Sequence, residues 1–498
     1  MFFILFSFVA VVFSVIFLYF RNQYKYFEDI GIEYDKATPI LGTFKNMILQ
    51  RESALDNMES VYNKFSSGIV GIFDMKNPAF LIRNPEVIRQ VLIKDFDNFH
   101  NRRKLFIDDS LLGHSTFQLY DQKWKDMRSS MSPAFTGSKM RAMFELIRDI
   151  GEETVTFLKT TGQTELNVKD FLSRYANDVI ATTAFGFQIN SNKDPENEFF
   201  KMGQEVTSGA FGLKFLFTSN FSKIANFFKM DLITERQRSY YMKLILDTMK
   251  YRKDNKVFRP DLLNIIMEMR EGQDNKKSSR HWKDVELVSQ CFAFFFAAFD
   301  TVSSTMSFIC QELMENQDCQ DKLREEILEI ADTLEGKPLS YEALTLMKYT
   351  DCVISEAMRK WPAAGQLDRI CTKAIVLHDP ETGKDVYIQK GDNIQISNVG
   401  LQRDPKYFPN PLKFDPERFN EENKKSINPN TLTSFGLGPR MCIGNRFAIL
   451  EMKSLIYHLF KEFKFEQHAK SVVPLLKLDP TSPNLEPKGG FWVKLSTL

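Results

Sequence analysis

Cysteine is scarce in this chain, and the cysteines that it has are not spaced as pairs. None of them forms a CxxC motif, which argues against a disulfide framework and against a cysteine-rich zinc site. Their scarcity favours a reducing, cytosol-facing compartment. The six positions are Cys291, Cys310, Cys319, Cys352, Cys371 and Cys442.

The chain also lacks an excess of charge, a linker and a repeat. Its 65 basic and 64 acidic residues give a formal net charge of +1, so its composition does not point to nucleic acid as a partner. A length of 498 residues suggests about three domains. However, no Pro/Gly/Ser-rich stretch divides it and no internal repeat is apparent. A G-x-G-x-x-G motif for a dinucleotide or a flavin is absent as well.

Charged residues are missing from Phe2 to Phe20. As a helix this run would span about 28 Å, close to the roughly 27 Å hydrocarbon core of the endoplasmic reticulum membrane. Arg21 and Lys25 follow it, which favours a cytoplasmic position for the downstream chain. A cleaved signal peptide is the alternative, but the run is long and lacks a basic n-region and a clear cleavage site. We therefore predict an uncleaved membrane anchor.

Cys442 is the cysteine with the most informative surroundings. It follows a glycine-rich turn and precedes apolar residues spaced for a helix, which predicts that a helix begins near Cys442. We expect the positive end of this helix to lower the pKa of the thiol. Gly436 and Gly438 can take positive φ angles, and their amides could donate hydrogen bonds to the sulfur. The simpler interpretation is a buried cysteine behind a glycine loop.

A second informative segment runs from Asp284 to Gln317, which contains neither Pro nor Gly and predicts one long helix. Its apolar core, Cys291–Phe299, is too short to cross a membrane. An acid at the edge of such a core, here Asp300, is costly unless it has a partner or a task. The Thr301 hydroxyl can donate to the carbonyl four residues back and bend the helix. The simpler interpretation is that the polar face of the helix starts at Asp300.

Short β elements are predicted among the helices. Residues 68–73 and 79–82 have the composition of two strands around a turn at 76–78. Residues 487–491 are typical of a turn between strands, and the polar run 271–283 predicts an exposed loop.

The segment 208–230 carries several phenylalanines among lysines. They could form ordinary helix core, or a patch that dips into the bilayer beside the anchor. Both interpretations stay open. The phenylalanines are Phe211, Phe215, Phe217, Phe221, Phe227 and Phe228.

The run FGLGPRMCIG, residues 435–444, resembles the haem-binding loop of the cytochrome P450 family, with Cys442 in the place of the axial ligand. The run AAFDT, residues 297–301, is similar to that family's oxygen-activation segment, although Ala298 stands where glycine is usual. This resemblance implies that Asp300 and Thr301 support proton delivery. It extends from about residue 30 to the C-terminus.

The resemblance implies a mainly α fold with small β-sheets (α+β), the cytochrome P450 fold, carrying an N-terminal transmembrane anchor helix. Its expected divisions are the anchor at 1–20, a linker at 21–40 and one haem-thiolate catalytic domain at 41–498. Haem b, iron protoporphyrin IX, is the expected cofactor.

The resemblance also assigns the contacts of the haem propionates. Trp124 and Arg128 form a WxxxR pair on one helical face, and Arg102, Arg369 and Arg440 match further family arginines. A buried dianionic cofactor needs such partners, because an unpaired buried charge is very costly. Without the resemblance, Trp124 and Arg128 would be interpreted as a packed ring beside a solvated charge.

Glu356 and Arg359 match a family pair that a second arginine, Arg418, completes as a structural network beneath the haem loop. Alone this ExxR spacing is a weak signal, since surface ion pairs at i,i+3 are common. The amino-acid sequences of residues 291–300, 359–362 and 414–419 are most similar to those of insect microsomal members of the family.

The activity implied is monooxygenation, which inserts one atom of dioxygen into a lipophilic small molecule and reduces the other to water. Insect relatives suggest xenobiotic or insecticide detoxification. NADPH–cytochrome P450 reductase is the expected partner, with a cytochrome b-type donor as an additional candidate. The expected location is the endoplasmic reticulum membrane with the catalytic domain facing the cytosol; nucleic acid is not an expected partner.

Three alternatives stay open. The substrate could be an endogenous steroid, fatty acid or hormone. The chain could be an isomerase or dehydratase that rearranges peroxides without a reductase, although Asp300–Thr301 argues against it. It could also be a non-catalytic haem protein that sequesters ligands.

Overall fold

The computed structural model describes residues 25–208, 212–274 and 282–497, together with scattered positions between 7 and 22. Much of the predicted anchor, Phe2 to Phe20, therefore lies outside the described residues. Its described positions are helical, and apolar side chains such as Phe13 and Phe17 are more than half exposed. The anchor stays a prediction.

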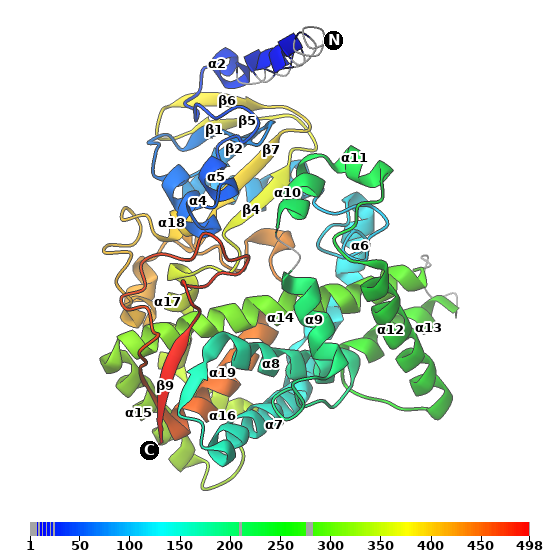
Figure 1. Ribbon diagram of the computed structural model, residues 1–498, viewed down its shortest axis with the longest axis vertical. Coiled ribbons are helices and arrows are strands. Elements are labelled where there is room, and N and C mark those ends of the chain that lie inside the picture. Colours follow the sequence, from blue (N-terminus) through cyan, green and yellow to red (C-terminus); the bar gives the residue numbers. More distant parts are fainter. Residues whose placement is uncertain are drawn as a thin grey trace.

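Helices dominate the described chain and form the larger, lower part of the molecule in Figure 1. Two of the three small sheets lie near the N-terminal end and the third lies near the C-terminus. The predicted mainly α fold with small β-sheets is confirmed. The helices are α2 (Tyr26–Ile30), α3 (Lys45–Ile48), α4 (Ala54–Tyr62), α5 (Pro85–Arg89), α6 (Asp121–Met131), α7 (Gly137–Thr161), α8 (Val168–Ile180), α9 (Glu198–Ser208), α10 (Leu213–Asn220), α11 (Ser222–Phe227), α12 (Glu235–Asn255), α13 (Leu262–Asp274), α14 (Asp284–Glu315), α15 (Gln317–Thr333), α16 (Tyr341–Leu346), α17 (Lys348–Lys360), α18 (Asn398–Gln402) and α19 (Asn445–Glu462).

Three sheets are formed by strands far apart in the sequence. The four-stranded sheet has the order β1-β2-β7-β4, the three-stranded sheet β3-β9-β8, and β5 pairs with β6 alone. The pairs are antiparallel except β2 with β7. The strands are β1 (Ile69–Asp74), β2 (Asn77–Ile82), β3 (Glu165–Asn167), β4 (Gln366–Ile370), β5 (Ile375–Asp379), β6 (Lys384–Ile388), β7 (Asn393–Ser397), β8 (Phe463–Gln467) and β9 (Trp492–Thr497).

The first hairpin is tighter than predicted. Asn77 and Pro78 belong to β2 and pair with Asp74 and Phe73, so the turn is confined to Met75 and Lys76. Met75 takes a positive φ of 53°, which lets two residues reverse the chain. Pro78 is tolerated because it lies at the start of its strand.

Helix α14 crosses the helical part of the molecule from one side to the other (Figure 1). It confirms the predicted long helix, although it ends at Glu315, two residues early. It is also the one helix in the described chain that is long and apolar enough to span a membrane, but 56% of its most apolar window is buried in the protein. It is therefore a core helix by its packing.

The predicted loop over 271–283 is partly wrong, because α13 continues to Asp274. Its helical pattern persists through polar residues there. Residues 275–281 lie outside the described part of the chain.

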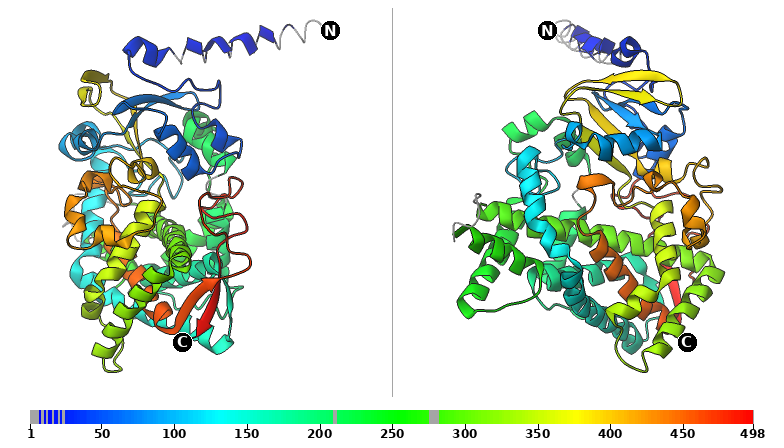
Figure 2. Two further views of the ribbon diagram at one scale, coloured as in Figure 1. Left: turned by 90° about the vertical axis from the view of Figure 1, so that its left-hand side faces the viewer. Right: turned by 180° about the vertical axis from the view of Figure 1, so that it is seen from behind.

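From Tyr26 onward the chain packs on the end of the molecule that holds the sheet with β1 and β2. Phe27, in α2, is fully buried, and a Cβ atom on Gly71 of β1 would come within 2.4 Å of its ring. Tyr34 then forms a parallel bridge with Gly71. In both views of Figure 2 the N-terminal segment projects beyond this end of the molecule.

Candidate functional site

The loop that carries Cys442 joins the short turn η8 (Gly438–Arg440) to α19. It is closed by backbone hydrogen bonds from the Cys442 amide to the Phe435 carbonyl at 2.8 Å and from the Met441 amide to the Gly438 carbonyl at 3.0 Å. Helix α19 begins at Asn445, three residues beyond the sulfur, with Gly444 as its N-cap. The helix near Cys442 is thus confirmed.

Glycine is required in this loop for two different reasons. Gly436 and Gly438 both take positive φ angles, 74° and 70°, as expected. A Cβ atom on Gly438 would also lie 2.0 Å from the carbonyl oxygen of Leu92, in the turn η1 (Gln90–Lys94). The loop is therefore pressed against η1 at a distance that no side chain allows.

Two expectations about the Cys442 sulfur are wrong. Its hydrogen bond comes from the amide of Gly444, whereas the amide of Gly436 donates to the Thr433 carbonyl. The pKa of the Cys442 thiol is raised, because surrounding protein disfavours the thiolate more than the Gly444 amide, Arg128 and Arg102 favour it. The side chain nevertheless stays accessible to solvent. Metal coordination, which deprotonates a thiol outright, is the usual source of a thiolate in such surroundings.

Backbone pairing brings three of the predicted arginines together. Asn101 forms an antiparallel bridge with Ile370 at the end of β4, which places Arg102 next to Arg369. Arg440 then reaches the same segment, because its Nε donates to the His100 carbonyl at 2.8 Å.

Arg440 makes the most contacts of the three. Its Nη2 donates to the Leu119 carbonyl at 2.7 Å and its Nη1 to the Thr116 carbonyl at 3.3 Å. Its guanidinium also lies 3.9 Å from the centroid of the Trp124 ring. Arg440 therefore fixes the loop that precedes α6.

This arginine cluster carries positive charge without a matching acid. Within the residues described, no ion pair joins Arg102, Arg369 or Arg440 to a carboxylate, and the nearby Asp368 accepts from the Arg103 amide at 2.6 Å. Burial and the mutual repulsion of the guanidinium groups lower the pKa of Arg369 to about 9 and that of Arg440 to about 8.

The same cluster has unused donors. The Nε atoms of Arg102 and Arg369 are buried without a hydrogen-bond partner. Buried donors and excess positive charge are stabilised by an anion that accepts several hydrogen bonds. The two propionates of haem meet this requirement, so the residues present fit the cofactor.

The predicted Trp124–Arg128 pair lies on α6 beside this cluster. Trp124 is buried against Arg440, and Arg128 is half-buried and donates from Nη2 to the Met441 carbonyl at 2.9 Å. Both residues thus contact the loop just before Cys442.

Helix α14 meets the cysteine loop through an aromatic contact. The ring of Phe294 lies 3.4 Å from the position of a Cβ on Gly444 and 5.3 Å, between centroids, from Phe447 of α19. About one and two turns further along α14, the side chains of Ala297 and Thr301 are exposed, whereas Phe299 and Val302 are buried. The Thr301 hydroxyl donates to the Ala297 carbonyl at 2.7 Å, as expected.

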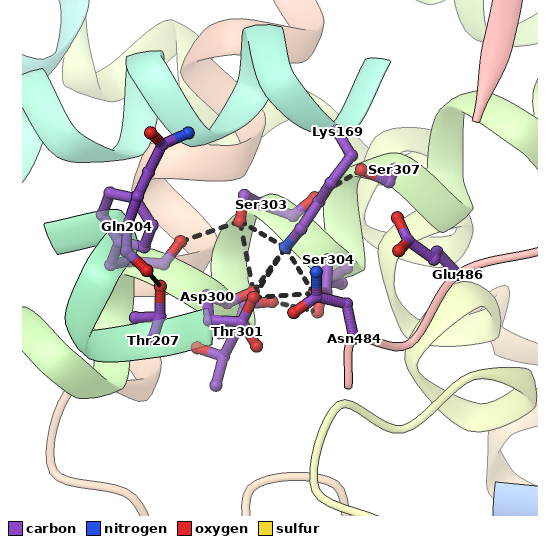
Figure 3. Close-up of polar contacts among 12 residues, drawn as sticks. Lys169, Gln204, Thr207, Asp300, Thr301, Ser303, Ser304, Ser307, Asn484 and Glu486 are labelled. Atoms are coloured by element: carbon purple, nitrogen blue, oxygen red, sulfur yellow. Dashed lines mark hydrogen bonds and ion pairs between the residues drawn. The ribbon is translucent and has the colours of Figure 1, made fainter. Parts of the chain in front are cut away.

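Asp300 has a partner that the sequence did not suggest. Lys169, in the first turn of α8, places its Nζ 2.8 Å from Asp300 Oδ1 (Figure 3). The same Nζ donates to the hydroxyls of Ser303 and Ser304 at 2.8 and 2.7 Å. No local motif announces Lys169, which is 131 positions away from Asp300.

The three residues of the predicted structural network do meet. Arg359 binds both oxygens of Glu356, at 2.7 and 2.9 Å, and both side chains are fully buried. Arg418 adds an ion pair to Glu356 at 3.4 Å, and the Asp415 amide donates to the same carboxylate at 3.0 Å. This network ties α17 to the segment that leads into the cysteine loop.

Some phenylalanines of the segment 208–230 are packed in the protein, and others are exposed to solvent. Phe215 packs on the main core, and Phe217 stacks on Phe221 at 5.1 Å between centroids. Phe227 and Phe228, at the end of α11, are 81% and 67% exposed. Phe211 lies outside the described residues.

Comparison with known proteins agrees with this geometry. The family model described as Cytochrome P450 matches residues 34–489. The chain is 45% identical over 490 residues to the probable cytochrome P450 9f2 of Drosophila melanogaster, covering 94% of both proteins. It is 36% identical over 525 residues to cytochrome P450 9e2 of Blattella germanica, covering 98% of this chain and 97% of that protein. Cytochrome P450 6k1 of the same organism is 33% identical over 494 residues, or 94% of this chain and 92% of the relative. The chain belongs to the cytochrome P450 family of haem-thiolate monooxygenases.

Proposed function

We propose that this monooxygenase oxidises lipophilic foreign compounds at the endoplasmic reticulum membrane. Haem b is its cofactor, and electrons come from NADPH through NADPH–cytochrome P450 reductase, with a cytochrome b-type protein as a second donor. The observation that carries this proposal is the arginine cluster beside Cys442, whose unpaired buried donors suit a dianionic cofactor.

The cysteine loop and the arginines would hold the cofactor between them. Cys442 Sγ would bind the haem iron, and its thiolate would supply the electron donation that favours cleavage of the O–O bond. Arg102 and Arg369 donate their free Nε–H groups to the propionates, and Arg440 adds its remaining N–H donors.

Trp124 and Arg128 complete this binding site from α6. The Trp124 ring supports the Arg440 guanidinium from one face, where a cation–π contact is favourable. Arg128 keeps the Met441 carbonyl fixed next to the ligand. Both residues therefore act on the position of the cofactor.

Asp300 and Thr301 would handle protons on the opposite side of the cofactor. A carboxylate at the edge of an apolar helix can pass a proton from water, and a hydroxyl can hold a water molecule in line with it. Thr301 is exposed on the stretch of α14 that leads away from the cysteine loop, as this role requires.

The substrate class rests on an aromatic wall that adjoins the arginine cluster. Phe106 lies 6.2 Å from Phe117 and 6.4 Å from Phe215, between ring centroids, and the Arg102 guanidinium lies 4.2 Å from the centroid of Phe117. Phe117 is 42% exposed, so an apolar molecule can reach it. An endogenous steroid, fatty acid or hormone would suit the same wall and is the alternative substrate.

Two parts of the chain, the N-terminal segment and the end of α11, would attach the protein to the membrane. Residues 1–20 would cross the bilayer, 21–40 would link the anchor to the catalytic domain at 41–498, and Phe227 and Phe228 would touch the lipid surface. The support is the charge-free run in the sequence and the exposure of both rings.

A two-part experiment tests the proposal. The purified full-length protein is titrated with lipophilic insecticides, plant toxins, steroids and fatty acids, and each ligand that shifts the haem spectrum is incubated with NADPH and reductase. Oxygenated products from foreign compounds support the proposal. Product from a peroxide without NADPH would indicate an isomerase, and spectral binding without any turnover would indicate a sequestering protein.

A further inference from the structure

Lys169 of α8 joins that helix to α14 through several hydrogen bonds at the predicted proton-delivery site. An ammonium group has three N–H donors and no acceptor. In Lys169 all three have a partner on one turn of α14: Asp300 Oδ1 at 2.8 Å, Ser303 Oγ at 2.8 Å and Ser304 Oγ at 2.7 Å (Figure 3). The Lys169 side chain is only 12% exposed.

The hydroxyls around Lys169 fix the direction of these bonds. Because Ser303 and Ser304 accept from the ammonium, they donate elsewhere. Ser303 Oγ donates to the Phe299 carbonyl at 2.8 Å, and Ser304 Oγ faces Asp300 Oδ1 at 3.5 Å. Ser303 Oγ also lies 3.2 Å from the Asp300 carbonyl, and Lys169 Nζ lies 3.4 Å from the same carbonyl. Every polar group of the cluster therefore has a partner within the cluster or on α14, as in a satisfied buried polar network.

The two oxygens of Asp300 are not equivalent as a result. Oδ1 accepts from Lys169 and faces Ser304, whereas Oδ2 has no hydrogen-bond partner among the described residues and is not a buried atom. A carboxylate held by one oxygen presents the other in a fixed direction. Thr301, the next residue, has its hydroxyl bound to the Ala297 carbonyl and lies on an exposed face of the helix.

A solvent-exposed lysine ion pair lacks these features. Lys193, which pairs with Glu153 at 2.7 Å, is 61% exposed and has a single acidic partner. Such pairs contribute little to stability because solvent screens them. Lys169 differs from Lys193 in its burial and in its number of partners. It differs from the buried Lys360 and Lys453 in binding the acid of the predicted proton-delivery site.

We propose that Lys169 is a positioning residue for proton delivery. It locks Oδ1 of Asp300 and leaves Oδ2 as the oxygen that relays protons. A hydronium ion from solvent gives a proton to Oδ2 and becomes water. The same proton then leaves Oδ2 for the water held beside Thr301, which passes one of its own protons to the oxygen atom that is reduced to water, so Asp300 returns to a carboxylate and the bridging water stays neutral. This role rests on the proposed function of the site and adds to it the residue that orients the acid.

Three variants test the role in turnover. Lys169→Met removes the charge and the donors at similar length, Lys169→Arg keeps the charge with different geometry, and Lys193→Met is the matched control. With reductase and NADPH, product formed per NADPH should fall about threefold or more in Lys169→Met, with KM unchanged, since proton transfer and not binding is affected. Lys169→Arg should fall between this variant and the wild type, and Lys193→Met should equal the wild type.

Non-additivity separates positioning from a general structural effect. In Asp300→Asn the acid is lost, so adding Lys169→Met should not lower the product per NADPH further. Additive losses would mean that Lys169 acts through something other than Asp300 and would overturn the proposal.

An infrared measurement provides a readout without turnover. The carboxylate band of Asp300, identified as the band lost in Asp300→Asn, should shift in the resting Lys169→Met protein and stay in place in Lys193→Met. If Lys169→Met fails to retain haem, the same band is measured in Lys169→Arg, where the planar guanidinium must also move it. An unmoved band in the variant that retains haem overturns the proposal.

The outcomes also distinguish this inference from the proposed function. If the wild type forms no product with any ligand, the monooxygenase assignment to those compounds fails, while the infrared band still decides the role of Lys169. If Lys169→Met forms as much product per NADPH consumed as the wild type, and its carboxylate band is unshifted, only the proposed role of Lys169 fails.

Discussion

Cys442 is the residue whose side-chain chemistry no other residue type in the chain can replace. We predict that Cys442→Ser abolishes the thiolate-specific absorption of the reduced carbon monoxide complex, because an oxygen ligand donates less electron density than a thiolate. The fold should persist, since the loop is closed by backbone hydrogen bonds. Cys319→Ser, in the half-buried part of α15, is the control and should keep the band. A thiolate band in Cys442→Ser would show that another residue is the ligand.

Thr301 is predicted to affect the use of electrons more than the binding of haem or substrate. In Thr301→Ala, proton delivery should falter, so that NADPH is consumed to form hydrogen peroxide and water instead of product. General acid–base catalysis of about 10²–10⁴-fold sets the upper limit of the loss. The measurement is product formed per NADPH consumed, with hydrogen peroxide assayed in parallel.

Thr305→Ala is the matched control for this prediction. Thr305 makes the same hydroxyl bond to the carbonyl four residues back, at 2.8 Å, but it is buried one turn further along α14. If the loss in Thr301→Ala came only from a change in the helix backbone, Thr305→Ala would reproduce it. If Thr301→Ala forms as much product per NADPH consumed as the wild type, Thr301 has no part in proton delivery.

Residues differ in how far the sequence alone could identify them. Cys442 and Thr301 lie in short runs that resemble family motifs, so the sequence could propose both residues without knowledge of the fold. Lys169 contacts Asp300 only because α8 packs across α14, and a contact over 131 positions leaves no local signal. The pKa of the Cys442 thiol was also mispredicted, because the helix terminus is local whereas the burial that raises the pKa comes from distant segments.

Among the elements, the loop from η8 to α19 has the strictest steric requirement. We predict that Gly438→Ala lowers haem content and the temperature of unfolding, because its Cβ would overlap the Leu92 carbonyl in η1 at 2.0 Å. A left-handed conformation alone costs about 1–2 kcal/mol for alanine. The further loss must come from displacement of the loop.

Gly383→Ala separates these two contributions. Gly383 has nearly the same φ, 67° against 70° for Gly438, and nothing lies within 4 Å of its Cβ position. This control should therefore show the cost of the backbone conformation with full haem content. Equal effects of the two substitutions on unfolding and on haem would contradict the proposed contact with η1.

Element boundaries were the least predictable part of the secondary structure. The long helix α14 was expected because 284–317 contains no residue that breaks a helix, and the structure ends it only two residues early. The turn at Met75–Lys76 was misplaced because Pro78 suggested a turn, whereas pairing with Phe73 keeps it in β2. Cross-strand pairing thus outweighed the local preference of proline.

For the whole molecule, composition and motif predicted the class of fold, but not how its parts meet. A mainly α chain with small sheets was expected, and the joining of β2 to β7, more than 300 positions apart, was not. The site depends on such joins: residues 101–102 reach Arg369 only because they pair with the end of β4. Long-range pairing of this kind is decided by the packing of the whole core and cannot be derived from one segment.

The proposed membrane attachment would be a property of the whole molecule, because the predicted anchor and the α11 rings would reach the bilayer from different parts of the chain. We predict that deleting residues 1–20 releases much of the protein from membranes and leaves the carbon monoxide band intact. Residual reversible binding should remain through Phe227 and Phe228, since one exposed apolar patch binds weakly without an anchor. The double substitution Phe227→Ser and Phe228→Ser should abolish this residual membrane binding of the truncated protein. Phe258, which is 68% exposed between α12 and α13, provides the control, and Phe258→Ser should leave the residual binding unchanged. Sedimentation with membranes in high salt provides the measurement. Full retention of the truncated protein there would show that the main attachment lies elsewhere in the catalytic domain.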